Sequence, residues 1–212
     1  MDTLTVNNFL PYPTQVRAWA MQQEFLNAKQ FTEKYDKHTD WPGSRTEHVY
    51  DLDNIYGDNV LNAFSNIIIR MTGRQGMTIK SYFQLTCEDD GDSWVHQDND
   101  IDYAGILYLN PNADPTTGTT LYRCNDVNKW TSYMSNQVGY ERLKKINSKE
   151  DVALYEQLFT PIDTIGNVFN RLVIYKGDIY HKSKKYFGKT KEDGRLTQVF
   201  FITFNKWIQA IK

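Results

Sequence analysis

Two side chains of metal-ligating type stand two residues apart in the stretch Trp94-Val95-His96-Gln97-Asp98. On an extended backbone, residues i and i+2 point to the same face, so the imidazole of His96 and the carboxylate of Asp98 can converge on one metal ion. The imidazole of His181 would complete a set of two histidines and one carboxylate. Such a set leaves coordination positions open, which suits an Fe(II) ion that must bind O2 and a co-substrate together. We therefore predict His96, Asp98 and His181 as iron ligands and as the catalytic residues.

The His-x-Asp pattern is weak evidence by itself, because chance matches are expected on the order of a few tenths per chain. In the alternative interpretation, His96 and Asp98 only hydrogen-bond in a turn, and His181 is an ordinary surface or core histidine. The interpretation as ligands gains support because His181 follows a predicted strand and turn. The other two histidines, His38 and His48, lie in the N-terminal region and are interpreted as non-ligands.

A cationic side chain follows His181 by fourteen residues, at the start of the strand-like run Arg195–Phe204. A 2-oxo acid such as 2-oxoglutarate can chelate the iron, and its distal carboxylate then needs a cation. The planar guanidinium of an arginine can pair both carboxylate oxygens, so Arg195 is predicted to bind the co-substrate. Thr197 shares a strand face with Arg195 and could add a hydroxyl donor. The alternative is a strand-edge arginine in a surface ion pair.

Tyr108 lies in the predicted core strand Gly105–Asn110. Its phenol could reach the same distal carboxylate, which would make Tyr108 a third co-substrate contact. A tyrosine in a core strand often only packs, with its hydroxyl at a polar edge. Both interpretations of Tyr108 stay open at this point.

The hydrophobic pattern predicts helices before strands. Helical periodicity and capping residues indicate helices over about 14–28, 60–73 and 149–159. Runs rich in Ile, Val, Thr, Tyr and Phe, separated by turn signals, indicate strands over 77–87, 103–109, 119–122, 171–175 and 195–204. This order favours an α+β domain in which helices pack outside a β-sandwich or jelly roll.

The chain length of 212 residues fits one domain, 1–212. We expect a helical N-terminal support over 1–76 and a β core over 77–204. An insertion over about 125–160 interrupts this core, carries a helix, and is rich in aromatic and apolar side chains: Trp130, Tyr133, Met134 and Tyr140. It could cover the active site, or build a satellite core over the sheet or a dimer contact.

These residues together resemble the prolyl-4-hydroxylase-like branch of the 2-oxoglutarate/Fe(II) oxygenases. The matching pieces occur in family order over roughly 77–204: His96-Gln97-Asp98, Ile106-Leu107-Tyr108-Leu109-Asn110, Gly118-Thr119-Thr120-Leu121-Tyr122, Asn170-Arg171-Leu172-Val173-Ile174-Tyr175, Tyr180-His181 and Arg195-Leu196-Thr197. The resemblance implies a double-stranded β-helix, a cupin-like jelly roll. It also implies an Fe(II) ion with 2-oxoglutarate and O2 as co-substrates, and a contact of Tyr108 with 2-oxoglutarate.

The N-terminal part of the chain looks like that of uncharacterised bacterial and phage oxygenases. The insertion over about 125–160 is longer than the core fold needs. The substrate class of the prolyl hydroxylases is therefore not carried over to this chain.

The bulk composition excludes several other classes. The net charge of -2 argues against a nucleic-acid partner, although a local lysine patch remains possible at Lys182, Lys184, Lys185, Lys189 and Lys191. No apolar run is long enough to cross a bilayer, and the N-terminal residues do not read as a signal peptide. Two cysteines do not make a disulfide scaffold, so we expect a cytoplasmic protein.

The sequence thus predicts a dioxygenase that couples oxidative decarboxylation of 2-oxoglutarate to hydroxylation of a peptidyl residue or a small molecule. Two alternatives stay open. One is a non-catalytic jelly-roll binding or structural protein, and the other is a jelly-roll metalloenzyme that does not use 2-oxoglutarate. A homodimer is possible.

Overall fold

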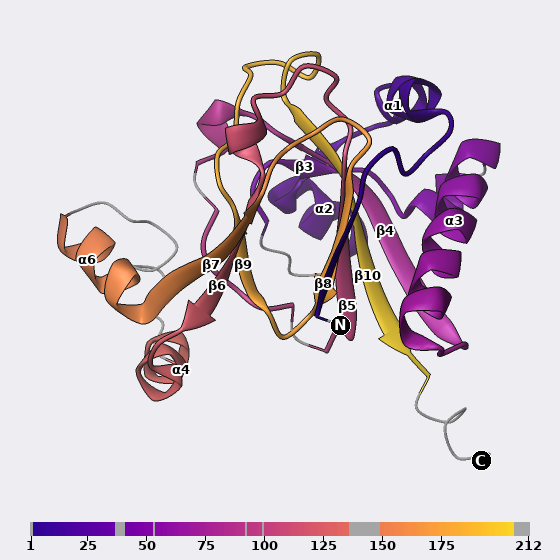
Figure 1. Ribbon diagram of the computed structural model, residues 1–212. Helices are drawn as coiled ribbons and strands as arrows, with labels where there is room; N and C mark the ends of the chain where they lie inside the picture. The colour runs from indigo at the N-terminus through magenta and orange to yellow at the C-terminus, as the bar shows by residue number, and fades with distance from the viewer. Residues whose placement is uncertain are drawn as a thin grey trace.

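The computed structural model describes residues 2–36, 41–52, 54–91, 93–98, 100–135 and 149–205 (Figure 1). His38 and Tyr140 lie outside these residues. The chain folds into two antiparallel sheets with helices packed outside them, so the prediction of mixed helix and sheet is confirmed. Within the described residues, no helix is long and apolar enough to cross a membrane.

The larger sheet has seven strands in the order β1-β8-β5-β10-β4-β3-β2. Their bounds are Thr3–Val6 (β1), Leu172–Lys176 (β8), Tyr103–Tyr108 (β5), Arg195–Phe204 (β10), Met77–Thr86 (β4), Ser44–Arg45 (β3) and Leu26–Asn27 (β2). Strand β10 lies at the centre, pairing Thr197 with Gln84 on one side and with Tyr108 on the other. This register carries Arg195 and Thr197 into the middle of the sheet.

The expected N-terminal support is not only helical, because β1, β2 and β3 join the larger sheet from this region. The helix predicted over 14–28 is also shorter and is followed by a second one: α1 covers Pro13–Ala20 and α2 covers Ala28–Tyr35. Asn27 caps α2, because its side chain accepts a hydrogen bond from the backbone of Gln30 (2.9 Å). Residues 26–27 also pair with β3, a long-range contact that helical periodicity cannot reveal.

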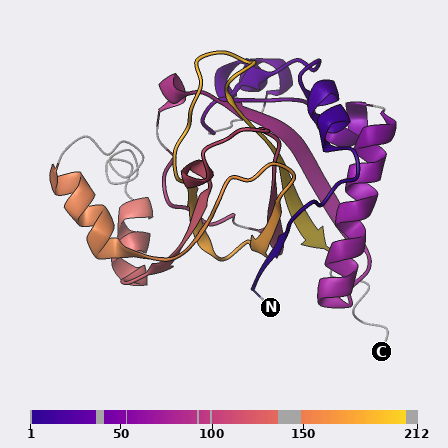
Figure 2. The ribbon, with the colours of Figure 1, turned by 45° about the horizontal axis from the view of Figure 1, so that its top comes forward.

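Helix α3, Ile55–Thr72, covers the outer face of the larger sheet (Figure 2). Asn54 caps its first turn, and Gly73 ends it with a φ of 69°, as predicted for this glycine. Phe64 and Phe200 stack with ring centroids 4.1 Å apart, and both rings are fully buried. The alternation of strand residues leaves the opposite face of the sheet free to build the site.

The smaller sheet has three strands in the order β7-β6-β9, with bounds Phe159–Ile165 (β7), Thr119–Cys124 (β6) and Tyr180–Ser183 (β9). Strands β7 and β9 were not predicted. A second core cluster joins the two sheets: Ala104, Ile106, Tyr108, Val173 and Tyr175 from the larger sheet meet Leu121 and Ile165 from the smaller one.

The insertion packs against the smaller sheet on the side of the molecule away from α3 (Figure 1). Its helices are α4, Val127–Ser135, and α6, Lys149–Leu158. Trp130 packs edge-on against Phe159 at 4.9 Å, within a third core cluster that also holds Val95, Tyr155 and Leu158. Of the two sequence-based alternatives, the structure favours the satellite core over the cover.

Candidate metal centre and its cavity

His96 and His181 are neighbours because their backbones form an isolated antiparallel bridge. The N–H of His96 donates to the carbonyl of His181 (3.0 Å), and the N–H of His181 donates back (2.9 Å). This bridge adds the His96 segment to the open edge of the smaller sheet, beside β9. Asp98 follows His96 by two residues and therefore lies beside the same edge of the smaller sheet.

Asp98 is fixed by a second backbone contact, in which its N–H donates to the carbonyl of Gly177 (2.9 Å). A Cβ added at Gly177 would lie 2.1 Å from the carbonyl oxygen of Ile101 and 3.0 Å from that of Asp98. Only glycine allows these chain segments to approach so closely. The Lys176-Gly177-Asp178 turn therefore positions a ligand far away in the sequence.

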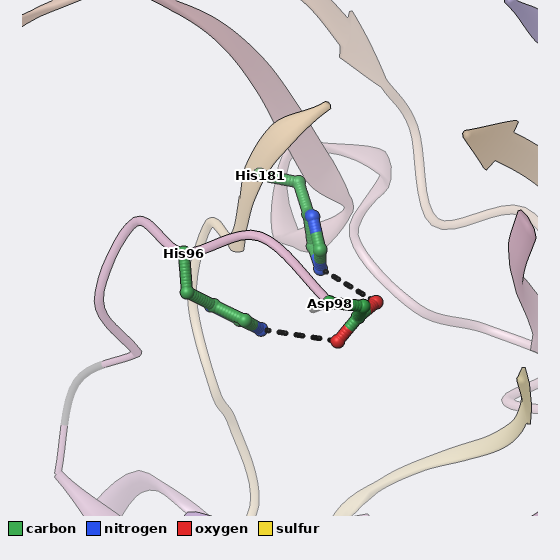
Figure 3. A group of neighbouring side chains, drawn as sticks. All are labelled: His96, Asp98 and His181. Carbon is green, nitrogen blue, oxygen red and sulfur yellow. Dashed lines mark ion pairs between the residues drawn. The ribbon is translucent and has the colours of Figure 1, made fainter. Parts of the chain in front are cut away.

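The three predicted ligands converge (Figure 3). Asp98 lies between the imidazoles: its Oδ1 is 4.0 Å from Nε2 of His96, and its Oδ2 is 3.5 Å from Nε2 of His181. One ligand atom from each residue lies within 4.8 Å of the others. This separation leaves room for one ion between the three, since bonds from a first-row metal ion to N or O atoms are about 2.0–2.2 Å long.

Both imidazoles are oriented by backbone carbonyls. Nδ1 of His96 lies 2.9 Å from the carbonyl oxygen of Trp94, and Nδ1 of His181 lies 2.9 Å from that of Ile179. Because a carbonyl only accepts, each Nδ1 carries the proton and donates it. Each Nε2 then keeps its lone pair toward Asp98, as a metal ligand requires.

His181 is kept neutral by its surroundings. Burial, and after it the neighbouring His96, lower its pKa to about 4, although Asp98 opposes the shift. Tyr175 packs against the imidazole with ring centroids 4.6 Å apart, and burial and Asp98 hold the pKa of its phenol far above the usual value. His181 is therefore a neutral ligand at physiological pH.

His48, which was interpreted as a non-ligand, lies away from the site. Its Nε2 is 3.1 Å from the carbonyl oxygen of Ile79.

A cavity of about 220 Å³ opens beside the three ligands. Arg195 and Thr197 line it together with His96, Asp98 and His181, so the predicted co-substrate and metal residues share one space. Most other lining residues come from the larger sheet and the segment before β3: Trp41, Pro42, Arg45, Gln84, Ala104, Gly105, Ile106, Tyr175, Val199 and Phe201, with Ser93, Trp94, Ser183 and Tyr186. Within the described chain, no residue of the insertion lines this cavity.

Arg195 is 3% exposed and its charge is incompletely paired. Its Nε donates to the carbonyl of Thr117 (3.3 Å), whereas Nη2 is buried without a hydrogen-bond partner among the described residues. Leaving a buried donor unpaired costs about 1–3 kcal/mol, and more for a charged group. The described part of the chain therefore supplies no acceptor for this donor. Thr197 forms only a long contact, 3.5 Å, with the carbonyl of Gln84.

Tyr108 is fully buried and does not line the cavity. Its hydroxyl donates to Oγ1 of Thr119 (2.8 Å), and its ring centroid lies 5.6 Å from Cζ of Arg195. Burial raises the pKa of the phenol, while Arg195 and Thr119 oppose the rise. In this arrangement Tyr108 packs beside Arg195 and supports it from behind.

Among the cavity residues that sequence reasoning missed are Arg45 and Tyr186. Tyr186 is 6% exposed, and burial raises the pKa of its phenol while Ser93, Arg195 and Arg45 oppose the rise. Arg45 belongs to the Trp41-Pro42-Gly43-Ser44-Arg45 segment. The Pro-Gly pair was a signal for a special backbone, but the local sequence does not indicate that this segment pairs with β4.

The profile of a family of unknown function, DUF6445, matches residues 2–202, nearly the whole chain. The chain belongs to this family. A search of curated proteins gives no match to this DUF6445 member. Solved structures do resemble it, and they include prolyl hydroxylases and a member of the 2OG-Fe(II) oxygenase family.

The structure of HygX from Streptomyces hygroscopicus with nickel and 2-oxoglutarate bound aligns with a TM-score of 0.62 and 10% identity, covering 97% of this chain and 84% of that one. A Trichoplax adhaerens prolyl hydroxylase in complex with a hypoxia inducible factor peptide gives 0.59 and 15% identity, covering 100% and 87%. A 2OG-Fe(II) oxygenase family oxidoreductase from Burkholderia pseudomallei gives 0.55 and 9%, covering 95% and 84%. The predicted resemblance to the prolyl-hydroxylase-like branch is thereby confirmed at the level of the fold.

Proposed function

We propose that this protein is a non-haem Fe(II) dioxygenase that couples the oxidative decarboxylation of 2-oxoglutarate to the hydroxylation of another substrate. In this proposal His96, Asp98 and His181 hold the iron, and Arg195 with Thr197 binds the distal carboxylate of 2-oxoglutarate. The two sheets are the walls of a double-stranded β-helix within a single domain, 1–212.

One observation carries the proposal. Three converging ligand atoms lie within 4.8 Å of one another, and they share their cavity with a buried arginine that has an unpaired donor. A metal site alone would not need that arginine. A cation facing the metal from a central strand is what a chelating dicarboxylate requires.

The donor set fits Fe(II). Two neutral imidazoles and one carboxylate bind one face of the ion and leave the other positions free for exchangeable ligands. When bound, Fe(II), 2-oxoglutarate and O2 together supply the oxidising chemistry, with succinate and CO2 as by-products.

The residues of the chain have simpler tasks. The carbonyls of Trp94 and Ile179 hold the Nδ1 protons, which keeps both Nε2 lone pairs on the metal side. Arg195 orients the co-substrate by its charge, and its 3% exposure keeps water from competing for the guanidinium. Tyr175 packs its ring against His181, which helps to keep that imidazole away from water. None of these residues has to move a proton.

The substrate to be hydroxylated is a peptidyl residue or a small molecule. The Trichoplax relative in fold was solved with a peptide, which supports the first possibility, and HygX was also solved with hygromycin B, which supports the second. A cytoplasmic location without nucleic-acid or membrane partners remains our expectation, and so does a possible homodimer.

Release of succinate from 2-oxoglutarate tests the proposal. The purified protein should release succinate in the presence of Fe(II) and ascorbate, and an Asp98→Ala variant should not. Isothermal titration with 2-oxoglutarate, with Zn(II) as an inert metal, separates the alternatives. A metalloenzyme of another kind would bind the metal but not 2-oxoglutarate, and a non-catalytic jelly roll would bind neither. Metal-dependent binding of 2-oxoglutarate without any succinate would also contradict the enzymatic proposal.

A further inference from the structure

A second arginine, Arg45, enters the cavity from the opposite side of β4. Strand β3 pairs Arg45 with Gln84, and β10 pairs Thr197 with the same Gln84. The three residues therefore form one row across the sheet and share its inner face. Gly43, with a φ of 71°, makes this row possible, because a Cβ there would lie 2.2 Å from the carbonyl oxygen of Leu85.

The guanidinium of Arg45 is held in place by its neighbours. Its Cζ lies 4.6 Å from the ring centroid of Trp41 and 5.6 Å from that of Phe201. Its Nη2 donates to Oε1 of Gln84 (3.2 Å), and Nε2 of Gln84 donates to the carbonyl of Pro42 (3.1 Å). The second of these bonds fixes the amide so that its oxygen faces Arg45. The arginine is thus preorganised before any ligand arrives.

Two donors on this wall have no acceptor. Nε of Arg45 and Nε1 of Trp41 are buried and lack a hydrogen-bond partner among the described residues, although both side chains line the cavity. Guanidinium and indole groups can only donate. Their natural complement is a group that can only accept, and a carboxylate is the commonest such group that also matches the fork of an arginine.

Arg45 remains charged at neutral pH, and among the described residues it forms no ion pair. Burial lowers its pKa to about 10, and the charge of Asp98 opposes the fall. Asp98 makes its close contacts with His96 and His181 instead, at 4.0 and 3.5 Å. A metal ion would engage the carboxylate further. Among the described residues, the cavity therefore holds two arginines with unpaired donors and one carboxylate, Asp98, which faces the metal site.

The two arginines stand on different strands, with β4 between them in the larger sheet. Strands lie about 4.8 Å apart and rise about 3.3 Å per residue, which places the Cα atoms of Arg45 and Arg195 roughly 12 Å from each other. At about 220 Å³ the cavity is smaller than a site for a drug-sized ligand, roughly 300–1,000 Å³. It suits the co-substrate together with the small charged end of a second molecule.

We propose that Trp41, Arg45 and Gln84 form the subsite that recognises the substrate to be hydroxylated, and that this substrate presents a carboxylate to it. This inference rests on the proposed function, because it assigns Arg195 to 2-oxoglutarate and leaves Arg45 for the second ligand. The carboxylate can belong to a free amino acid or small acid, to a peptide C-terminus, or to an acidic side chain.

The test compares carboxylates with their uncharged amides. The protein is loaded with Zn(II) and saturating 2-oxoglutarate, and the probes are added at millimolar concentrations and followed by ligand-observed NMR and thermal shift. Three probe pairs separate the sources: L-norvaline and its amide, the peptide Gly-Gly-Ala and its C-terminal amide, and N-acetylaspartate amide beside N-acetylasparagine amide. The variants are Arg45→Met, Arg45→Lys and, as a control on the exposed face of α3, Arg70→Met.

We expect the wild type to bind at least one carboxylate about 10- to 100-fold more tightly than its amide, the range for a charge-assisted hydrogen bond. Arg45→Met should abolish this preference and change 2-oxoglutarate affinity by less than about threefold. Arg45→Lys should recover part of the preference for carboxylates, since the positive charge remains but the planar guanidinium with its paired donors is lost. Arg70→Met should behave as the wild type.

Several results would overturn the subsite. One is the lack of any preference for carboxylates in a wild type that binds 2-oxoglutarate normally. Another is a loss of 2-oxoglutarate binding in both Arg45→Met and Arg45→Lys while both still melt cooperatively, which would make Arg45 the co-substrate anchor. A wild type that binds no 2-oxoglutarate at all would instead refute the proposed function, together with this inference.

Discussion

Replacing Arg195 by methionine should lower the affinity for 2-oxoglutarate without lowering the free energy of unfolding. Arg195 is 3% exposed, and its Nη2 has no partner among the described residues. Its Nε donates to the carbonyl of Thr117 at 3.3 Å. Methionine fills a similar volume without a charge. The variant therefore loses a cation that the folded chain does not pair, and keeps most of the packing.

The magnitudes follow from this arrangement. Truncating one partner of a buried, hydrogen-bonded charge pair costs roughly 2–5 kcal/mol, so the affinity for 2-oxoglutarate should fall roughly 30-fold to several thousand-fold. The free energy of unfolding of the metal-free protein should stay the same or rise by up to about 2 kcal/mol, because a buried charge without a partner is removed. Zinc affinity should change little, since no ligand is touched.

Isothermal titration of the Zn(II) protein with 2-oxoglutarate and urea unfolding of the metal-free protein measure the two effects. Arg123→Met, at an exposed position on β6, is the matched control. An unchanged affinity for 2-oxoglutarate in Arg195→Met would mean that the anchor lies elsewhere. A marked loss of stability with unchanged affinity would show that Arg195 is a structural residue, and would refute the reasoning from its unpaired donor.

Three further predictions concern the surroundings of the site. In the metal-free protein, the free energy of unfolding should fall as the pH drops from about 6.5 toward 4, because the unfolded chain protonates His181 first, and the contribution is about 3 kcal/mol. Urea titrations across this range should show a loss that is larger in the wild type than in His181→Asn by about this amount, since carboxyl groups with lowered pKa values, such as Glu47, titrate alike in both proteins. Gly177→Ala should weaken zinc binding at least tenfold and lower the melting temperature, since its Cβ would meet the Ile101 carbonyl at 2.1 Å and displace Asp98; a variant with normal zinc affinity would contradict this account. Trp130→Ala should destabilise the protein by about 3–5 kcal/mol as a core residue does, and a stable variant with altered substrate-coupled turnover would restore the idea of a cover.

The sequence was sufficient for the parts of the site that depend on local geometry. His96 and Asp98 converge because a two-residue spacing on an extended backbone places both side chains on one face. Arg195 and Thr197 share a face of β10 for the same reason, and both line the cavity. The helix ending at Gly73 was likewise predictable, because a left-handed glycine ends a helix wherever it stands.

Only the tertiary structure decided what depends on strand pairing across long separations. Arg45 reaches the cavity because β3 pairs with β4, about 40 residues later, and neither strand's own sequence specifies this partner. The position of Tyr108 also depends on contacts between distant strands. Its hydroxyl donates to Thr119 of the opposite sheet and does not face the cavity. The aromatic side chains of the insertion could serve a cover or a core equally well. The packing of Trp130 against Phe159 of β7 and Tyr180 of β9 favours the core, because burial is a property of the assembled fold and not of the residue type.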